Sequence, residues 1–147
     1  MAAGFAAIFA ALFGAHQVAD HWVPTDAQAA RKGMPGRAGR VACTAHVATY
    51  TATALVFLAP VLLLLDVHIS VWRLAAGLAF SAVTHWVIDR RWPLVWLAER
   101  TGSRRFVRLG CPRPGHDDNP SLGTGAYALD QSAHYVALFV AALVAVA

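Results

Sequence analysis

The sequence carries little charge for its length. Only 14% of its 147 residues are Asp, Glu, Lys or Arg, whereas 58% are hydrophobic. Soluble domains usually carry about 25% charged residues. This composition therefore argues against an ordinary soluble domain and is typical of a membrane protein of one compact bundle.

Cysteine is also scarce, and a basic N-terminal region is missing. Cys43 and Cys111 form neither a CxxC pair nor a disulfide framework. No basic residue precedes Arg31, so the positive region that opens a secretory signal peptide is not expected. We expect both thiols to be reduced, one in a helix and one in a cytoplasmic loop.

Four apolar runs are long enough to span a bilayer, which takes about 20 helical residues. They predict an all-α, integral membrane four-helix bundle formed by a single transmembrane domain of residues 1–147. The domain has four expected helices and two long loops. The helices cover about residues 3–23, 41–65, 71–90 and 126–147, and the loops cover about 24–40 and 91–125.

The basic residues gather in and beside these two loops. Four lie in the first loop and seven in or next to the second, against Arg73 alone at the other end. Positive-inside bias predicts cytoplasmic loops and both termini outside, in the bacterial inner membrane. The net charge of +4 is thereby explained without nucleic acid. Within the loops, residues 26–32 and 92–97 suggest short interfacial segments.

His and Asp side chains lie at the loop-facing ends of the apolar runs. Three pairs are spaced four residues apart, so each pair can share one helix face. The predicted topology brings all of them to one layer, within roughly two helical turns of the inner interface. Two similar hairpin-like halves result. The seven residues are His16, Asp20, His46, His85, Asp89, Asp130 and His134.

These side chains are suited to divalent metal. Charged groups inside a bilayer cost several kcal/mol each and usually face a bundle interior. Imidazole and carboxylate ligands suit Zn²⁺, Mn²⁺ or Fe²⁺, and helical bundles build such sites from inward-facing His and carboxylate. We expect the seven residues to bind one or two ions.

Two metal-free interpretations remain open. The pairs can form hydrogen bonds that hold helices together, or a His–Asp proton relay. The outer halves of the expected helices are nearly free of polar groups. This argues against a continuous path and hence against transport.

The motifs are distinctive as a set: His16-Gln-Val-Ala-Asp20, His46 followed by Tyr50, His85-Trp-Val-Ile-Asp89 and Asp130-Gln-Ser-Ala-His134. They resemble the small bacterial and phage membrane proteins of the domain-of-unknown-function family 3307. The resemblance covers about Phe13 to Val136, and Lys32 matches a Lys of that family. His21 and Pro24 depart from its usual aromatic residue and Gln. That family is loosely similar to proteins labelled metal-dependent hydrolases, and a phage origin is implied.

The expected function is a metal-dependent hydrolase at the cytoplasmic membrane face. A metal-bound water with a pKa of about 7 would attack an ester or phosphoester, including a lipid-linked one. The candidate catalytic carboxylates are Asp20, Asp89 and above all Asp130, as general base. The candidate substrate-binding residues are Lys32, Arg31 and Arg90, and His116 and Asp117 form a candidate lid.

The alternative is a non-catalytic membrane protein. Its His/Asp site, with or without metal, would be structural, and it would act through a host membrane partner. Other expected contacts are membrane lipid and a second copy packed through the small residues of the 71–90 helix.

Overall fold

The computed structural model describes residues 2–65, 67–111 and 124–147. Within them the chain is helical and contains no strand. The predicted all-α class and the four membrane-length apolar helices are confirmed. The long helices are α1 (Ala2–His21), α3 (Gly36–Leu64), α4 (Val71–Asp89) and α6 (Gly125–Val146). The short ones are α2 (Asp26–Arg31), α5 (Trp92–Arg100) and the 3₁₀ turn η1 (Phe106–Arg108).

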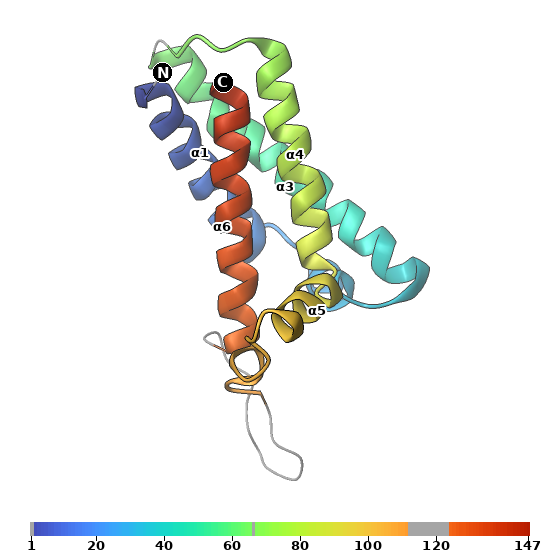
Figure 1. Ribbon diagram of the computed structural model, residues 1–147. Helices are drawn as coiled ribbons and strands as arrows, with labels where there is room; N and C mark the ends of the chain where they lie inside the picture. The colour runs from blue at the N-terminus through green and yellow to red at the C-terminus, as the bar shows by residue number, and fades with distance from the viewer. Residues whose placement is uncertain (1, 66, 112–123) are drawn as a thin grey trace.

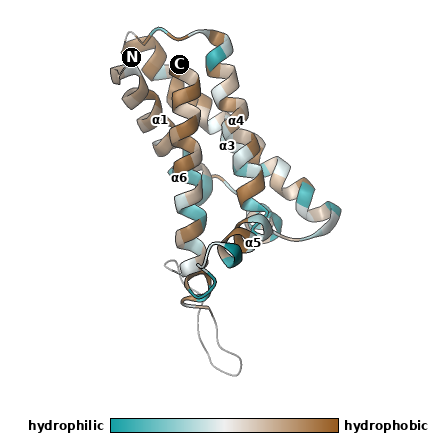
Figure 2. Ribbon diagram, in the orientation of Figure 1, coloured by the Kyte–Doolittle hydropathy of each residue, from teal (hydrophilic) through white to brown (hydrophobic). Residues whose placement is uncertain are grey.

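The four long helices form one elongated bundle (Figure 1). Both termini lie at the same end of it, and α5 lies at the other end. Hydropathy follows the same axis, because hydrophilic residues are concentrated toward the α5 end (Figure 2). This is the distribution expected of a bundle with one polar end.

The core is built from small and aromatic side chains. Ile8, Leu12 and Ala15 of α1 are buried in one core cluster with residues of α3 and α6, and Phe5 meets Phe139 edge to face with ring centroids 5.3 Å apart. The helices α4 and α6 lie close together at Gly77, where a Cβ atom would lie 2.6 Å from a carbonyl oxygen of α6. Small residues permit such backbone contact between membrane helices. Part of the small-residue face of α4 therefore packs within the chain.

The helix α3 is longer than predicted. It begins at Gly36 rather than near residue 41, so Arg37 and Arg40 belong to a helix and not to a loop. The Pro and Gly residues of this stretch suggest irregular chain, but Pro35 is extended and Gly36 has a positive φ of 81°. Together they turn the chain directly into the helix. At 29 residues α3 is roughly 43 Å long.

Both predicted loops contain helices. A capping box between Thr25 and Gln28 begins α2, close to the interfacial segment expected at 26–32. In the second loop α5 begins after Arg91, whose positive φ of 61° breaks the chain away from α4. Residues 26–31 and 92–100 of the expected loops are therefore helical.

Candidate metal centre

The seven predicted ligands meet at one level of the bundle, near its α5 end. Six of them have buried or nearly buried side chains and are connected by ring contacts or by His–Asp pairs, and Asp130 lies at the edge with its side chain 23% exposed. Each long helix contributes at least one. The contributors are His16 and Asp20 of α1, His46 of α3, His85 and Asp89 of α4, and Asp130 and His134 of α6.

Four heteroatoms converge at the middle of this layer. The Nε2 of His46 lies 2.9 Å from Asp20 Oδ1, 3.1 Å from His85 Nε2 and 3.2 Å from Asp89 Oδ2. The Nε2 of His85 lies 3.3 Å from each of the same two carboxylate oxygens. Ligands of a tetrahedral ion at 2.0–2.1 Å are separated by about 3.3 Å. The spacing therefore fits a shell around one cation.

His134 completes a second, overlapping set. Ligand atoms of Asp20, His85, Asp89 and His134 all lie within 4.8 Å of one another, a group able to hold a metal ion. The Nδ1 of His134 lies 2.9 Å from the carbonyl oxygen of Asp130, which can only accept. Its Nε2 therefore presents a lone pair, and within the described chain that atom is buried without a hydrogen-bond partner. Metal-binding histidines are typically oriented in this way.

His16 supports the same interpretation. It is fully buried, and neither ring nitrogen has a hydrogen-bond partner in the described residues, although Nδ1 lies 3.7 Å from Asp20 Oδ2. Its ring stacks on that of His134 at 4.8 Å. Buried polar atoms without partners cost roughly 1–3 kcal/mol each. The layer therefore holds more ligand atoms than its own hydrogen bonds use.

Lys32 enters the centre from the end of α2. Its Nζ lies 2.9 Å from Asp89 Oδ1, 3.5 Å from Asp20 Oδ1 and 3.1 Å from His46 Nε2. Burial alone would lower the pKa of Lys32, but the carboxylates of Asp89 and Asp20 outweigh it and raise that pKa. One ammonium thus offsets part of the charge of two carboxylates. The sequence pattern contains no sign of this pairing, because Lys32 shares no helix with either Asp.

Arg90 holds the chain that carries Lys32. It is only 6% exposed, and its guanidinium donates from Nη1 to the Lys32 carbonyl at 2.5 Å and from Nη2 to the Met34 carbonyl. Gly39 makes room for this turn, since a Cβ atom there would overlap the Met34 carbonyl. Arg90 thus directs two of its N–H groups at backbone carbonyls rather than at solvent.

Of the other predicted site residues, the structure describes Arg31. Arg31 is exposed on α2 and faces away from the cluster, into a groove described below. His116 and Asp117, the candidate lid, lie outside the described residues.

Tyr50 and Ser81 form a layer beneath the centre that was not predicted. Their hydroxyls are 2.5 Å apart, and the Tyr50 ring stacks on His85 with centroids 4.0 Å apart. Each is placed by helical spacing, four residues after His46 and four before His85. Polar residues at that spacing inside apolar runs were the available signal.

A helical bundle of membrane-length helices with a buried layer of His, Asp and Lys defines the class of this protein. The chain belongs to the family described as protein of unknown function (DUF3307), whose model matches residues 8–147. The family predicted from the motifs is therefore confirmed, over a longer stretch than they cover. No curated protein and no solved structure matches the chain.

Proposed function

We propose that the protein is a metal-dependent hydrolase of the membrane interface. Its substrate would be an ester or phosphoester, lipid-linked, and its cofactor one or two ions of zinc, manganese or iron. The observation that carries the proposal is the buried group of Asp20, His85, Asp89 and His134, with ligand atoms within 4.8 Å of one another. His46 and His16 supply further nitrogen atoms beside it.

The roles of the residues follow from their exposure. A divalent ion supplies a bound water of lowered pKa and a Lewis acid. Asp130 is the open carboxylate of the layer, and its Oδ2 lies 3.5 Å from His134 Nδ1, so it can take a proton and orient His134. Asp20 and Asp89 are the buried anionic ligands. Lys32 would bind substrate charge once a metal has replaced it at the carboxylates.

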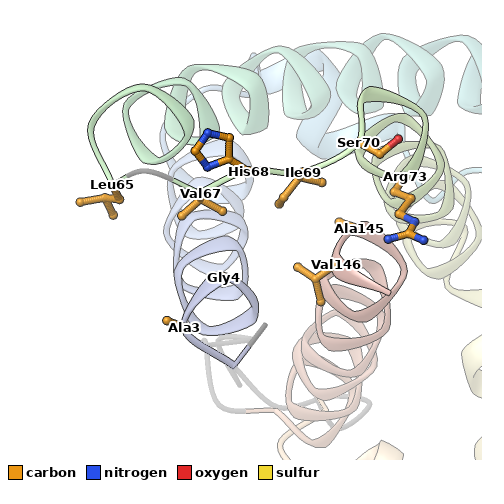
Figure 3. A pocket seen from close by; sticks show the side chains of 10 residues that line it. All are labelled: Ala3, Gly4, Leu65, Val67, His68, Ile69, Ser70, Arg73, Ala145 and Val146. Carbon is orange, nitrogen blue, oxygen red and sulfur yellow. The ribbon is translucent and has the colours of Figure 1, made fainter.

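Metal analysis tests this proposal. We expect detergent-purified protein to hold one or two ions per chain by elemental mass spectrometry. His85→Ala should lower the metal content about tenfold or more, because it removes a central ligand. His68→Ala is the matched control, since His68 lies at the opposite end of the bundle (Figure 3). Metal-free wild type, or equal metal in His85→Ala, would contradict the proposal.

Hydrolysis is measured on the same samples with chromogenic ester and phosphodiester substrates. Asp130→Asn should retain its metal and lose activity. Activity that is unaffected by metal removal would exclude the hydrolase.

A second candidate is a structural His/Asp/Lys layer in a phage-encoded protein that acts on a host membrane partner. Lys32 favours it, because this residue already pairs with both carboxylates. Metal that is absent from a stable wild type would select this candidate.

The proposed orientation places the centre on the cytoplasmic side of the inner membrane. It is supported by the basic residues at that end and by the two termini at the other (Figure 1). Cys111 is exposed and Cys43 is buried, so an impermeant maleimide can report on Cys111 alone. We expect no labelling in intact cells and labelling after permeabilisation. Ser70→Cys in a Cys111→Ser background should give the reverse, and labelled Cys111 in intact cells would invert the topology.

The far end of the bundle has a pocket of its own. It measures about 300 Å³ and lies between the first turn of α1, the α3–α4 connection and the end of α6 (Figure 3). The side chains of His68, Ser70 and Arg73 border it. This pocket contributes no residue to the centre.

A further inference from the structure

A groove of about 550 Å³ runs between α2 and the first turns of α3, on the flank of the bundle. No step of the proposed hydrolysis uses it. Two arginines and a strip of apolar side chains line it. They are Arg31 and Arg37, then Ala38, Val41, Ala42 and Ala45, and Ala27 and Gln28 of α2 complete the lining.

The floor of the groove is an uncovered helix face. Its apolar residues follow the spacing i, i+3, i+4 and i+7, so they share one side of α3. Val41 is 61% exposed, whereas Gly39, Cys43 and His46 on the neighbouring side of α3 are buried. Three of the four strip residues are alanines, which leaves depth for a ligand chain.

The two guanidinium groups are available for an anion. Arg31 ends α2 and Arg37 is in the first turn of α3, and both are exposed. Neither has an ion-pair partner among the described residues, in contrast to the adjacent Lys32, which is held by Asp89 and Asp20. Arginine binds phosphate oxygens with a planar, bidentate geometry.

The length of α3 indicates how deep the arginines and the apolar strip of the groove lie in a bilayer. The roughly 43 Å length of α3 exceeds a hydrocarbon core of about 30 Å, so one end of it projects. The first turns carry Arg37 and Arg40, and the apolar outer half of α3 needs the hydrocarbon. Arg37 thus lies at headgroup depth, and Ala45 lies about 12 Å deeper.

We propose that this groove binds an anionic phospholipid, with its phosphate between Arg31 and Arg37 and an acyl chain along the strip from Ala38 to Ala45. The arginines at headgroup depth and the deeper apolar strip match the order of phosphate and acyl chain in that lipid. Arg31 precedes Lys32 and Ala45 precedes His46, so the lipid lies on the two helices that supply the Lys and one His of the centre. That the lipid class is also the substrate class rests on the proposed function; binding does not.

Competition between lipids tests the groove. Protein in detergent micelles with equal phosphatidylglycerol and phosphatidylcholine is analysed by native mass spectrometry. Wild type should retain phosphatidylglycerol, and Arg31→Gln/Arg37→Gln should lower its retention at least about tenfold. Ala42→Phe should block retention by filling the strip. Arg40→Gln is the matched control, because Arg40 is exposed on the same helix but does not line the groove.

The results separate this site from the metal centre. Unchanged retention in the double variant, an equal loss in Arg40→Gln, or preference for phosphatidylcholine would overturn the lipid site. So would displacement of the lipid by inorganic phosphate together with normal retention in Ala42→Phe, because a free-anion site would explain both. Metal is measured in parallel. Lipid retention in a metal-free wild type would contradict the proposed metal-dependent hydrolase and would support the lipid site.

Discussion

Lys32→Met should make the metal-free protein less stable by about 3–5 kcal/mol, because it leaves two buried carboxylates without their cation. The side chains of Asp20 and Asp89 are only 6% and 2% exposed, and that of Lys32 is 13% exposed. Little solvent therefore reaches the two carboxylates in place of the ammonium. Unfolding in detergent, followed by circular dichroism in the presence of a chelator, measures the loss. Lys32→Arg keeps the charge and is the control.

Lys32→Met should also bind divalent metal more tightly than wild type. An ammonium 2.9 Å from Asp89 occupies the position of a cation and repels one. Its removal should improve metal affinity at least about tenfold, and added Zn²⁺ or Mn²⁺ should restore much of the lost stability. A variant that no ion stabilises would show that Lys32 alone is the counterion, and would favour the structural layer.

The effect of pH on this contribution has a definite sign. The pKa of Lys32 is raised above its usual value of 10.5. Its stabilisation is therefore complete below pH 10.5 and is lost as pH rises through the higher folded-state value. Because Lys32 stays charged over this range, its contribution to the stability difference between wild type and Lys32→Met should be constant from pH 7 to 9.

Arg90→Ala should destabilise the protein by about 3 kcal/mol, because it removes two hydrogen bonds from a charged, buried donor. Both bonds fix the turn from Lys32 to Met34, so metal affinity should fall with stability. Thermal unfolding in detergent and metal titration measure the two effects. Arg104→Ala is the control, since Arg104 is exposed and has no such bonds within the described chain.

Gly39→Ala disturbs the same turn from the opposite side. Its Cβ would overlap the Met34 carbonyl that Arg90 binds. Because both changes act on one element, the double variant should be less destabilised than the sum of the two singles. Additive losses, or an Arg90→Ala variant as stable as Arg104→Ala, would show that the turn does not depend on Arg90.

The layer of His and Asp was predictable because the helical spacing and the alternating direction of the four spans both place these residues together. Helical spacing pairs His85 with Asp89, and the alternating direction of the four spans brings every pair to one level. Neither step requires side-chain detail. The early start of α3 was not predictable in this way, since Pro35 and Gly36 indicate irregular chain as readily as the beginning of a helix.

The roles of Lys32 and Arg90 lay beyond the sequence for a different reason. Both depend on the path of the chain between α1 and α3, which folds back over the end of the bundle. A basic loop residue has the same sequence signature whether it meets solvent, lipid or a buried carboxylate. Only the three-dimensional path shows that Lys32 points inward and Arg31 outward.

The turn held by Arg90 also bears on how the two hairpins become one molecule. Lys32 comes from the first hairpin and pairs with Asp89 of the second, while Arg90 of the second binds the backbone of the first. The covalent link between the hairpins joins the end of α3 at Leu64 to the start of α4 at Val71, at the far end of the bundle. Asp89 therefore obtains its ammonium partner only after both hairpins are in place. Either hairpin without the other leaves the buried carboxylate of Asp89 without the ammonium of Lys32.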